Sequence, residues 1–250
     1  MLGAITGDIV GSVYEFNNIR TKHFPLFTKN NFFTDDTVMT VAVADILKNK
    51  KDVIQTLHYW GNKYPNVSYG GNFGCWLKLR ETKPYYSFGN GSAMRVSACG
   101  WYGKTKKEVI DYAVKVTRVT HNHPEGLKGA IVTAMCVYMA RTNKSKEEIR
   151  NYVSKFYNLN FDYEELKKNY YFDESCQNTV PQAIFCFLIS NSFEDCIRTT
   201  ISIGGDCDTT ASISGAIAEA YYGIPDNIKN TVKKYLPEEM LEVLDEYPKH

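Results

Sequence analysis

The sequence shows no marked excess of charge of either sign. It contains 29 Lys and Arg residues against 28 Asp and Glu residues, for a formal net charge of +1 at pH 7. Proteins that bind nucleic acids generally, or anionic membranes, need a clustered positive field to attract a polyanion. The near balance argues against both partners, and it predicts that any phosphate-bearing ligand is held by a local arrangement of groups.

Paired cysteines and an export signal are also missing. The seven cysteines are odd in number and include no C-x-x-C pair, which argues against a disulfide framework and against a structural zinc site. Residues 1–16 lack the basic segment of a signal peptide and include Asp8 and Glu15, so they predict neither export nor a membrane span. These absences together predict a cytoplasmic protein.

Sustained alternation of polar and apolar residues, which would indicate β-strands, is hard to find anywhere in the chain. Apolar residues instead recur at helical spacing, for example from Val38 to Ile46 and again after the His123-Pro124 pair. No linker or shift in composition divides the chain. We therefore predict a single all-α domain over residues 1–250, with about ten or more helices of ordinary length.

Capping sequences predict where several of these helices begin. In a capping box, a Ser or Thr and a Glu three residues later satisfy backbone N–H groups at the helix start. Such pairs begin predicted helices at Thr105 (105–118) and Ser145 (145–157), and a similar start lies near Ser192.

Three loops are too rich in Gly and Asn to be mere connections, and each precedes a predicted helix. They are residues 65–74, 87–91 and 203–206. The second loop leads into the helical pattern of 92–99. Successive N–H groups of such a loop can form an anion-binding concavity.

Two adjacent carboxylates stand at a predicted helix start in the segment TDDT, which includes Thr34, Asp35 and Asp36. A Thr or Asp at this place caps free N–H groups, and carboxylates favour the positive end of the helix dipole. The segment can therefore be a plain helix cap or part of a site.

A denser group of oxygens lies in the segment GGDCDTT, residues 204–210. One carboxylate is enough for a cap, whereas Asp206, Asp208 and Thr209 place three hard oxygen donors within one helical turn. Such donors select Mg²⁺, Mn²⁺ or Ca²⁺ over zinc. This segment is the strongest sign of a metal site in the chain.

A third acidic group lies near the N-terminus, where Asp8, Gly11 and Glu15 are spaced to share one face of a predicted helix. A buried carboxylate needs a cation or hydrogen-bond partner, because an isolated buried charge is too costly to keep ionised. The three acidic groups can form one shared metal centre or be three separate helix ends, and their spacing alone leaves both alternatives open.

Five motifs in this order, GDIVGSVYE, FTDDT, FGNGSAMR, THNHPEG and SIGGDCDTTASISGAIAEAYYG, resemble the ADP-ribosylglycohydrolase family over residues 1–223. The resemblance implies a compact orthogonal helical bundle that cuts the glycosidic bond between ADP-ribose and an acceptor. It implies a binuclear Mg²⁺ or Mn²⁺ site at the bottom of an ADP-ribose cleft. The implied partner is the ADP-ribose moiety of a modified protein, nucleic acid or small molecule, and we expect a monomer.

The resemblance also assigns roles to individual residues. The implied metal ligands are Thr34, Asp35, Asp36, Asp206, Asp208 and Thr209. The implied nucleotide contacts are Ser87, Phe88, Gly89, Asn90, Gly91 and His121. Glu15 matches a glutamate near the metals, and either Glu15 or Asp36 is expected to act as the catalytic acid or base.

Some points stay open at this level. Arg95 can brace the 87–91 loop or pair with a carboxylate. Cys207 stands where many relatives carry Thr, but between the expected ligands Asp206 and Asp208, so the site should survive. The chain is short for the family, which leaves the acceptor open. A protein that binds ADP-ribose without cleaving it, and a dinuclear phosphohydrolase, are the two alternative functions, and the products released would distinguish them.

Overall fold

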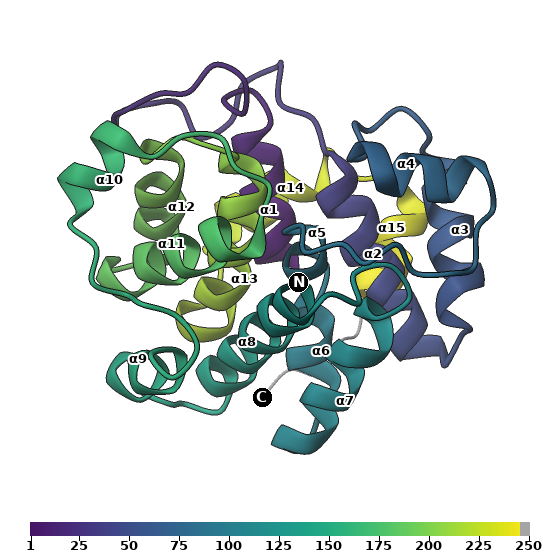
Figure 1. Ribbon diagram of the computed structural model, residues 1–250. Helices are drawn as coiled ribbons and strands as arrows, with labels where there is room; N and C mark the ends of the chain where they lie inside the picture. Colours follow the sequence, from purple (N-terminus) through teal and green to yellow (C-terminus); the bar gives the residue numbers. More distant parts are fainter. Residues whose placement is uncertain (246–250) are drawn as a thin grey trace.

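The computed structural model of the chain describes residues 1–245, and its regular elements are helices packed into one body (Figure 1). Within that range the only β-type pairing is an isolated antiparallel bridge between Gly89 and Ser175. The predicted all-α fold is therefore confirmed. None of the helices in this part of the chain combines the length and apolarity needed to cross a bilayer. The helices are α1 (Leu2–Gly11), α2 (Asp35–Asn49), α3 (Val53–Lys63), α4 (Gly71–Lys78), α5 (Gly91–Met94), α6 (Ser97–Tyr102), α7 (Lys106–Thr117), α8 (Pro124–Arg141), α9 (Lys146–Val153), α10 (Tyr163–Asn169), α11 (Cys176–Ile189), α12 (Phe193–Ser202), α13 (Cys207–Tyr222), α14 (Asp226–Lys233) and α15 (Glu238–Leu244).

The centre of the fold is the pair α1 and α13, which lie side by side although they come from opposite parts of the sequence (Figure 1). Every residue of α1 is buried, and α13 is buried from Cys207 to Ala220. A helix that is apolar and covered on all sides belongs in the interior of a protein, and helices such as α8, α11 and α12 provide the cover here.

Glycines on α1 make this close approach possible. Gly3, Gly7 and Gly11 are four residues apart and share one face of the helix. A Cβ atom at these positions would lie 2.2 Å from the Gly215 carbonyl oxygen, 2.0 Å from the Ala211 carbonyl oxygen and 2.4 Å from the Asp208 Cα atom, respectively. No side chain fits there, so the backbone of α1 packs directly on α13. This contact fixes the position of the N-terminal end of α13.

The predicted helix starts are confirmed by their caps. The Thr105 hydroxyl accepts a hydrogen bond from the Glu108 amide at 3.2 Å, and Ser145 forms the full capping box with Glu148. The Ser192 hydroxyl accepts one from the Asp195 amide at 3.1 Å. The helix predicted for residues 145–157 is shorter than expected, because α9 ends at Val153.

The pattern over residues 92–99 predicted one helix, but the chain forms two short ones, α5 and α6, with Arg95 and Val96 between them. Arg95 is almost fully buried and its Nε atom donates a hydrogen bond back to the Gly91 carbonyl. The guanidinium also lies over the ring of Phe73, with 4.9 Å between its central carbon and the ring centroid. These contacts hold Arg95 at the break, where its side chain faces the cleft described next.

Candidate active site

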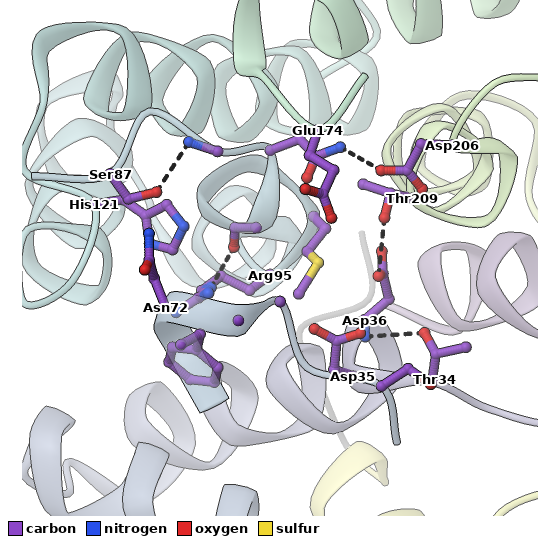
Figure 2. A pocket seen from close by; sticks show the side chains of 18 of the residues that line it. Thr34, Asp35, Asp36, Asn72, Ser87, Arg95, His121, Glu174, Asp206 and Thr209 are labelled. Atoms are coloured by element: carbon purple, nitrogen blue, oxygen red, sulfur yellow. Dashed lines mark hydrogen bonds between the residues drawn. The ribbon is translucent and has the colours of Figure 1, made fainter. Parts of the chain in front are cut away.

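A cleft lies where several helix starts and loops converge (Figure 2). Segments far apart in the sequence meet there: the turn after α1, the start of α2, the start of α4, the 87–91 loop and the start of α13. The lining residues are Glu15, Thr34, Asp35, Asp36, Ser68, Gly70, Gly71, Asn72, Phe73, Tyr85, Ser87, Gly89, Asn90, Gly91, Met94, Arg95, His121, Glu174, Asp206, Asp208 and Thr209. The three acidic segments therefore do not end at unconnected helix tips.

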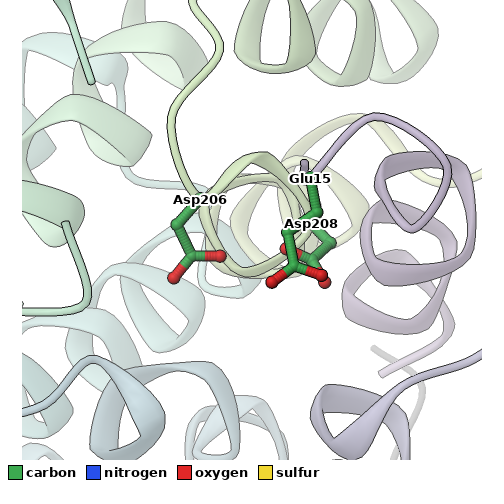
Figure 3. Close-up of side chains that lie close together, drawn as sticks. All are labelled: Glu15, Asp206 and Asp208. Carbon is green, nitrogen blue, oxygen red and sulfur yellow. The ribbon is translucent and has the colours of Figure 1, made fainter. Parts of the chain in front are cut away.

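One cluster in the cleft joins Glu15 to Asp206 and Asp208 (Figure 3). Each offers a carboxylate oxygen, and these oxygens lie within 4.8 Å of one another. Three carboxylate oxygens at this separation can hold a divalent cation.

Glu15 does not reach this cluster from a helix face, and the prediction that Asp8, Gly11 and Glu15 share such a face is wrong. Helix α1 ends at Gly11, and Glu15 lies in the turn that follows. Asn18 holds this turn, because its Nδ2 atom donates to the carbonyl oxygens of Tyr14, Glu15 and Gly205 at 2.8, 3.0 and 3.0 Å. The Asn18 side chain thus holds the turn and also ties it to Gly205, the residue before Asp206.

Asp8 lies behind the cleft wall and is fully buried. Its carboxylate accepts hydrogen bonds from the amides of Thr34 and Thr37, both at 3.0 Å, from the Thr34 hydroxyl at 2.8 Å and from the Thr37 hydroxyl. Burial raises the pKa of Asp8 to about 6, although these four hydrogen bonds oppose the rise. Asp8 therefore fixes the first turn of α2 against α1 instead of joining the acidic cluster.

The TDDT segment is both a helix cap and part of the cleft. The Thr34 hydroxyl accepts a hydrogen bond from the Asp36 amide at 3.3 Å, as an N-cap does. The Asp36 Oδ2 atom accepts one from the Thr209 hydroxyl at 3.1 Å, which joins the start of α2 to the start of α13. The other oxygen of Asp36 is buried without a hydrogen-bond partner among the described residues. The two interpretations left open by the sequence are thus compatible.

The cleft brings together several carboxylates that are largely shielded from solvent. Burial, and then repulsion from neighbouring carboxylates, raises the pKa values of Asp35, Asp36 and Asp208 well above the ordinary value of an aspartate. Burial and the charges of Asp206, Asp8 and Glu174 raise the pKa of Glu15 to about 7. So many carboxylates remain ionised together only when cations compensate them.

The 87–91 loop lines the opposite wall, but its amides are only partly free to bind an anion. The Gly89 amide donates to the Ser87 hydroxyl at 3.1 Å, and the Asn90 amide donates to the Glu174 carbonyl at 2.6 Å. The Asn90 side chain donates to Asp206 Oδ2 at 2.7 Å, so the loop braces the acidic cluster. Phe88 does not line the cleft: its side chain is about half exposed and lies edge-on to His123.

A better anion-binding feature is the start of α4, which belongs to the 65–74 loop. Gly70 precedes the helix and no side chain caps it. Gly70, Gly71 and Asn72 line the cleft, and a Cβ at either glycine would meet nothing within 4 Å. Uncapped N–H groups at a helix start, with room in front of them, suit a phosphate group.

Two basic side chains complete this wall. Arg95 is the one Lys or Arg among the described residues that line the cleft, and its Nη1 atom is buried without a hydrogen-bond partner there. His121 is buried, and its Nδ1 atom lies 2.8 Å from the Thr120 hydroxyl. Burial and the Arg95 charge lower the pKa of His121 well below its usual value, so the imidazole is neutral.

Sequence patterns missed Glu174, which lines the cleft beside Asp206 (Figure 2). It belongs to a stretch without a recognisable motif. Its position depends on long-range backbone pairing, because the Cys176 amide donates to the Phe88 carbonyl at 3.0 Å on the other side of the Gly89–Ser175 bridge. No local pattern reveals a contact of this kind.

Fold and cleft together describe an all-α protein in which a cluster of carboxylates adjoins a wall that carries Arg95 and the uncapped start of α4. The family profile described as ADP-ribosylglycohydrolase matches residues 1–249. The chain belongs to the ADP-ribosylglycohydrolase family and is a hydrolase of glycosyl bonds. The resemblance inferred from the five motifs is thereby confirmed.

Curated relatives and a solved structure agree with this assignment. The chain is 28% identical to ADP-ribosylhydrolase ARH3 of Mus musculus over 306 aligned positions, covering 90% of this chain and 83% of the mouse protein. It is 26% identical to ADP-ribosyl-[dinitrogen reductase] glycohydrolase of Rhodospirillum rubrum, covering 90% and 85% of the two chains. A solved ADP-ribosylglycohydrolase-related protein complex shares the fold, with a TM-score of 0.74 at 22% identity over 97% of this chain and 93% of that one.

Proposed function

We propose that this protein hydrolyses the glycosidic bond between ADP-ribose and an acceptor, with two divalent cations, Mg²⁺ or Mn²⁺, in the acidic part of the cleft. The observation that carries the proposal is the convergence of Glu15, the TDDT segment and the GGDCDTT segment on one cleft, whose other wall carries Arg95 and the uncapped start of α4. The ADP-ribose moiety of a modified protein, nucleic acid or small molecule is the proposed substrate. A cytoplasmic monomer remains our expectation.

The residues present fit such cations. Their donors are carboxylate and hydroxyl oxygens, which Mg²⁺ and Mn²⁺ prefer. The orphaned Asp36 oxygen and the upward pKa shifts of the neighbouring aspartates are the signs of a site that needs positive charge. The proposed ligands are Thr34, Asp35, Asp36, Asp206, Asp208 and Thr209.

When bound, the cations would lower the pKa of a water molecule and stabilise negative charge at the reaction centre. The protein's own groups supply orientation and proton transfer. Glu15 and Asp36 are the proposed acid and base, since both carboxylates face the cleft. Without cations the pKa of Glu15 is raised to about 7 by burial and neighbouring carboxylates, and bound cations would lower it again. An oxocarbenium-like transition state is further stabilised by the surrounding carboxylates.

The other wall is proposed to hold the nucleotide part. Arg95 and the free start of α4 supply positive charge and N–H donors for the pyrophosphate. Ser87, Asn90 and His121 line the same wall and offer further polar contacts. Gly89 and Gly91 keep the loop backbone close to the ligand. For Phe88 the proposed contact requires the ligand to extend beyond the cleft, because this ring lies outside the lining.

The experiment is to incubate the protein with a panel of ADP-ribosylated peptides and small molecules, with and without Mg²⁺ or Mn²⁺, and to identify products by mass. We expect release of free ADP-ribose that depends on the cation. Asp208→Ala should abolish both turnover and cation binding, whereas Asp111→Asn, an exposed aspartate on α7 outside the cleft, should change neither. Full activity of Asp208→Ala in excess chelator would refute the proposal. Release of inorganic phosphate would indicate a phosphohydrolase, and binding without turnover a binding protein.

A further inference from the structure

A second cavity, of about 510 Å³, is formed by α10, the segments before and after it, and α11; α10 lies at the edge of the molecule in Figure 1. We call it the α10 cavity. Its volume is within the usual range of small-molecule sites, about 300 to 1,000 Å³. No residue lines both this cavity and the cleft. The lining residues are Asn160, Phe161, Asp162, Glu165, Leu166, Asn169, Tyr170, Tyr171, Asp173, Asn178 and Gln182.

Tyr170 connects the α10 cavity to the loop that carries Asp206. A Cβ atom on Gly205 would lie 2.4 Å from the Tyr170 Cε1 atom, so the ring packs directly on the backbone beside Asp206. The Tyr170 hydroxyl donates to the Asn178 carbonyl, and the Tyr170 carbonyl accepts a hydrogen bond from Arg20 at 2.8 Å. A ligand in the α10 cavity would therefore touch a firmly held ring that supports one end of the acidic cluster.

One buried polar atom in the lining of the α10 cavity lacks a partner. Gln182 is only 7% exposed, and its Oε1 atom has no hydrogen-bond partner among residues 1–245. A buried acceptor without a donor is costly and calls for an explanation. The terminal amide of a glutamine rotates over a broad range, so this oxygen can turn towards the cavity. The α10 cavity therefore suits a ligand that brings an N–H donor to Gln182.

The charges of the lining exclude one class of ligand. Asp162, Glu165 and Asp173 contribute carboxylates, and no Lys, Arg or His lines the cavity. Neither lysine of α10 is part of the lining, and Lys167 pairs with Glu164 at 3.3 Å. Water reaches these carboxylates, so they do not require a cation, but their field repels phosphates and other anions and favours a positively charged ligand.

Apolar side chains provide much of the remaining surface. Phe161, Leu166 and Tyr170 belong to a small hydrophobic cluster apart from the main core, and the exposed Tyr171 adds another ring. An ammonium group is attracted both to a carboxylate and to the face of an aromatic ring, whereas methylene groups pack on apolar surface. A linear aliphatic polyamine alternates ammonium and methylene groups and so matches this mixed lining.

We propose that the α10 cavity is a second ligand site, separate from the cleft, and that it binds a linear aliphatic polyamine. One ammonium group donates to the Oε1 atom of Gln182, and the others lie near the carboxylates of the lining. The methylene chain packs on Phe161 and Tyr170. This site goes beyond the proposed hydrolase function and does not depend on it, because it uses no residue of the cleft.

The test is calorimetric titration of spermidine into the full chain at physiological ionic strength, with saturating Mg²⁺ present. Gln182→Leu removes the acceptor and keeps a side chain of similar size, and it should weaken spermidine binding about tenfold, as for the loss of a hydrogen bond to a charged group. Glu165→Gln should weaken binding by about two- to fivefold, since its charge is exposed. Glu164→Gln, on the same helix but outside the lining, is the matched control and should leave the affinity unchanged. Without spermidine, Gln182→Leu should melt no earlier than the wild type, because the oxygen it removes has no partner among the described residues.

A further comparison separates this site from the acidic cleft. Asp208→Ala should bind spermidine like the wild type, whereas loss of binding in that variant, with displacement of spermidine by Mn²⁺, would place the polyamine in the cleft and overturn the proposal. No binding of spermidine by the wild type, or wild-type affinity in both Gln182→Leu and Glu165→Gln, would overturn it as well. Equal binding of putrescine and of the uncharged diol with the same carbon chain would refute the polyamine as the ligand class. None of these outcomes bears on the proposed hydrolase function.

Discussion

The contact of Gly11 with α13 gives the sharpest prediction about the acidic cluster. A Cβ atom on Gly11 would lie 2.4 Å from the Cα, 2.8 Å from the Cβ and 2.8 Å from the nitrogen of Asp208. Carbon atoms in good contact are about 3.5 to 4.0 Å apart, so Gly11→Ala must move the Asp208 backbone by about 1 Å. Overpacking of this kind costs about 1 to 3 kcal/mol, and the better helix propensity of Ala offsets up to about 1 kcal/mol of it.

The same shift would misplace Asp208, one member of the acidic cluster that is proposed to bind cations. We expect Gly11→Ala to bind Mn²⁺ about 10 to 100 times more weakly, the usual effect of disturbing the groups that orient a ligand. Titration calorimetry, at a temperature where the variant is folded, measures this affinity. Urea unfolding in the presence of chelator measures the loss of stability separately.

Gly3→Ala is the matched control for this variant. Its Cβ would lie 2.2 Å from the Gly215 carbonyl oxygen, which is an equally severe contact in the same helix pair but far from the cleft. Gly3→Ala should therefore lower the free energy of unfolding to a similar extent and bind Mn²⁺ like the wild type. Normal Mn²⁺ affinity of Gly11→Ala, or equal weakening by Gly3→Ala, would show that this packing does not position Asp208.

Three further predictions concern charge. Asp8→Asn weakens the four hydrogen bonds that Asp8 accepts from Thr34 and Thr37. It should lower the free energy of unfolding, measured in urea, by about 2 to 4 kcal/mol. A loss below about 0.5 kcal/mol would contradict the bracing role of Asp8. Without divalent cations, the folded protein holds protons on Asp8 and Glu15 up to pKa values of about 6 and 7, whereas the unfolded chain releases them near pH 4 to 4.5. Stability should therefore fall as pH rises from about 4 to 8, and saturating Mg²⁺ should remove the fall; thermal melts that rise with pH in chelator would refute this sign. Arg95→Met keeps the length of the side chain and should weaken ADP-ribose binding about tenfold or more in calorimetry, whereas unchanged affinity would exclude Arg95 from the pyrophosphate site.

Most of the helices, and the cleft's acidic side, could be predicted because their signals are local. The capping pair Ser145 and Glu148 and the apolar spacing after Thr37 depend only on neighbours in the sequence. The GGDCDTT segment could be singled out for a similar reason, since three oxygen donors in one turn exceed what a helix cap requires. The ligand atoms of this part of the site therefore lie within one helical turn of the sequence.

Other features depend on contacts between distant segments, which no local pattern contains. Helical spacing places Asp8 and Glu15 on one face, but α1 ends at Gly11, and Asn18 ties the turn that follows to Gly205. Glu174 reaches the cleft only through its pairing with the 87–91 loop. The amides of Gly89 and Asn90 are likewise used in contacts within the protein, which is why the proposed pyrophosphate site relies on Arg95 and the start of α4.

The direct seating of α1 on α13 has a consequence for how the protein is made. During synthesis residues 2–11 leave the ribosome roughly 200 residues before their partner, 207–222, is complete. Contacts between such distant segments form late and slow folding, and uncovered apolar surface invites aggregation meanwhile. The nascent chain must therefore carry an unpaired apolar helix until residues 207–222 have been synthesised, so we expect production of this enzyme to depend strongly on chaperones that shelter residues 2–11.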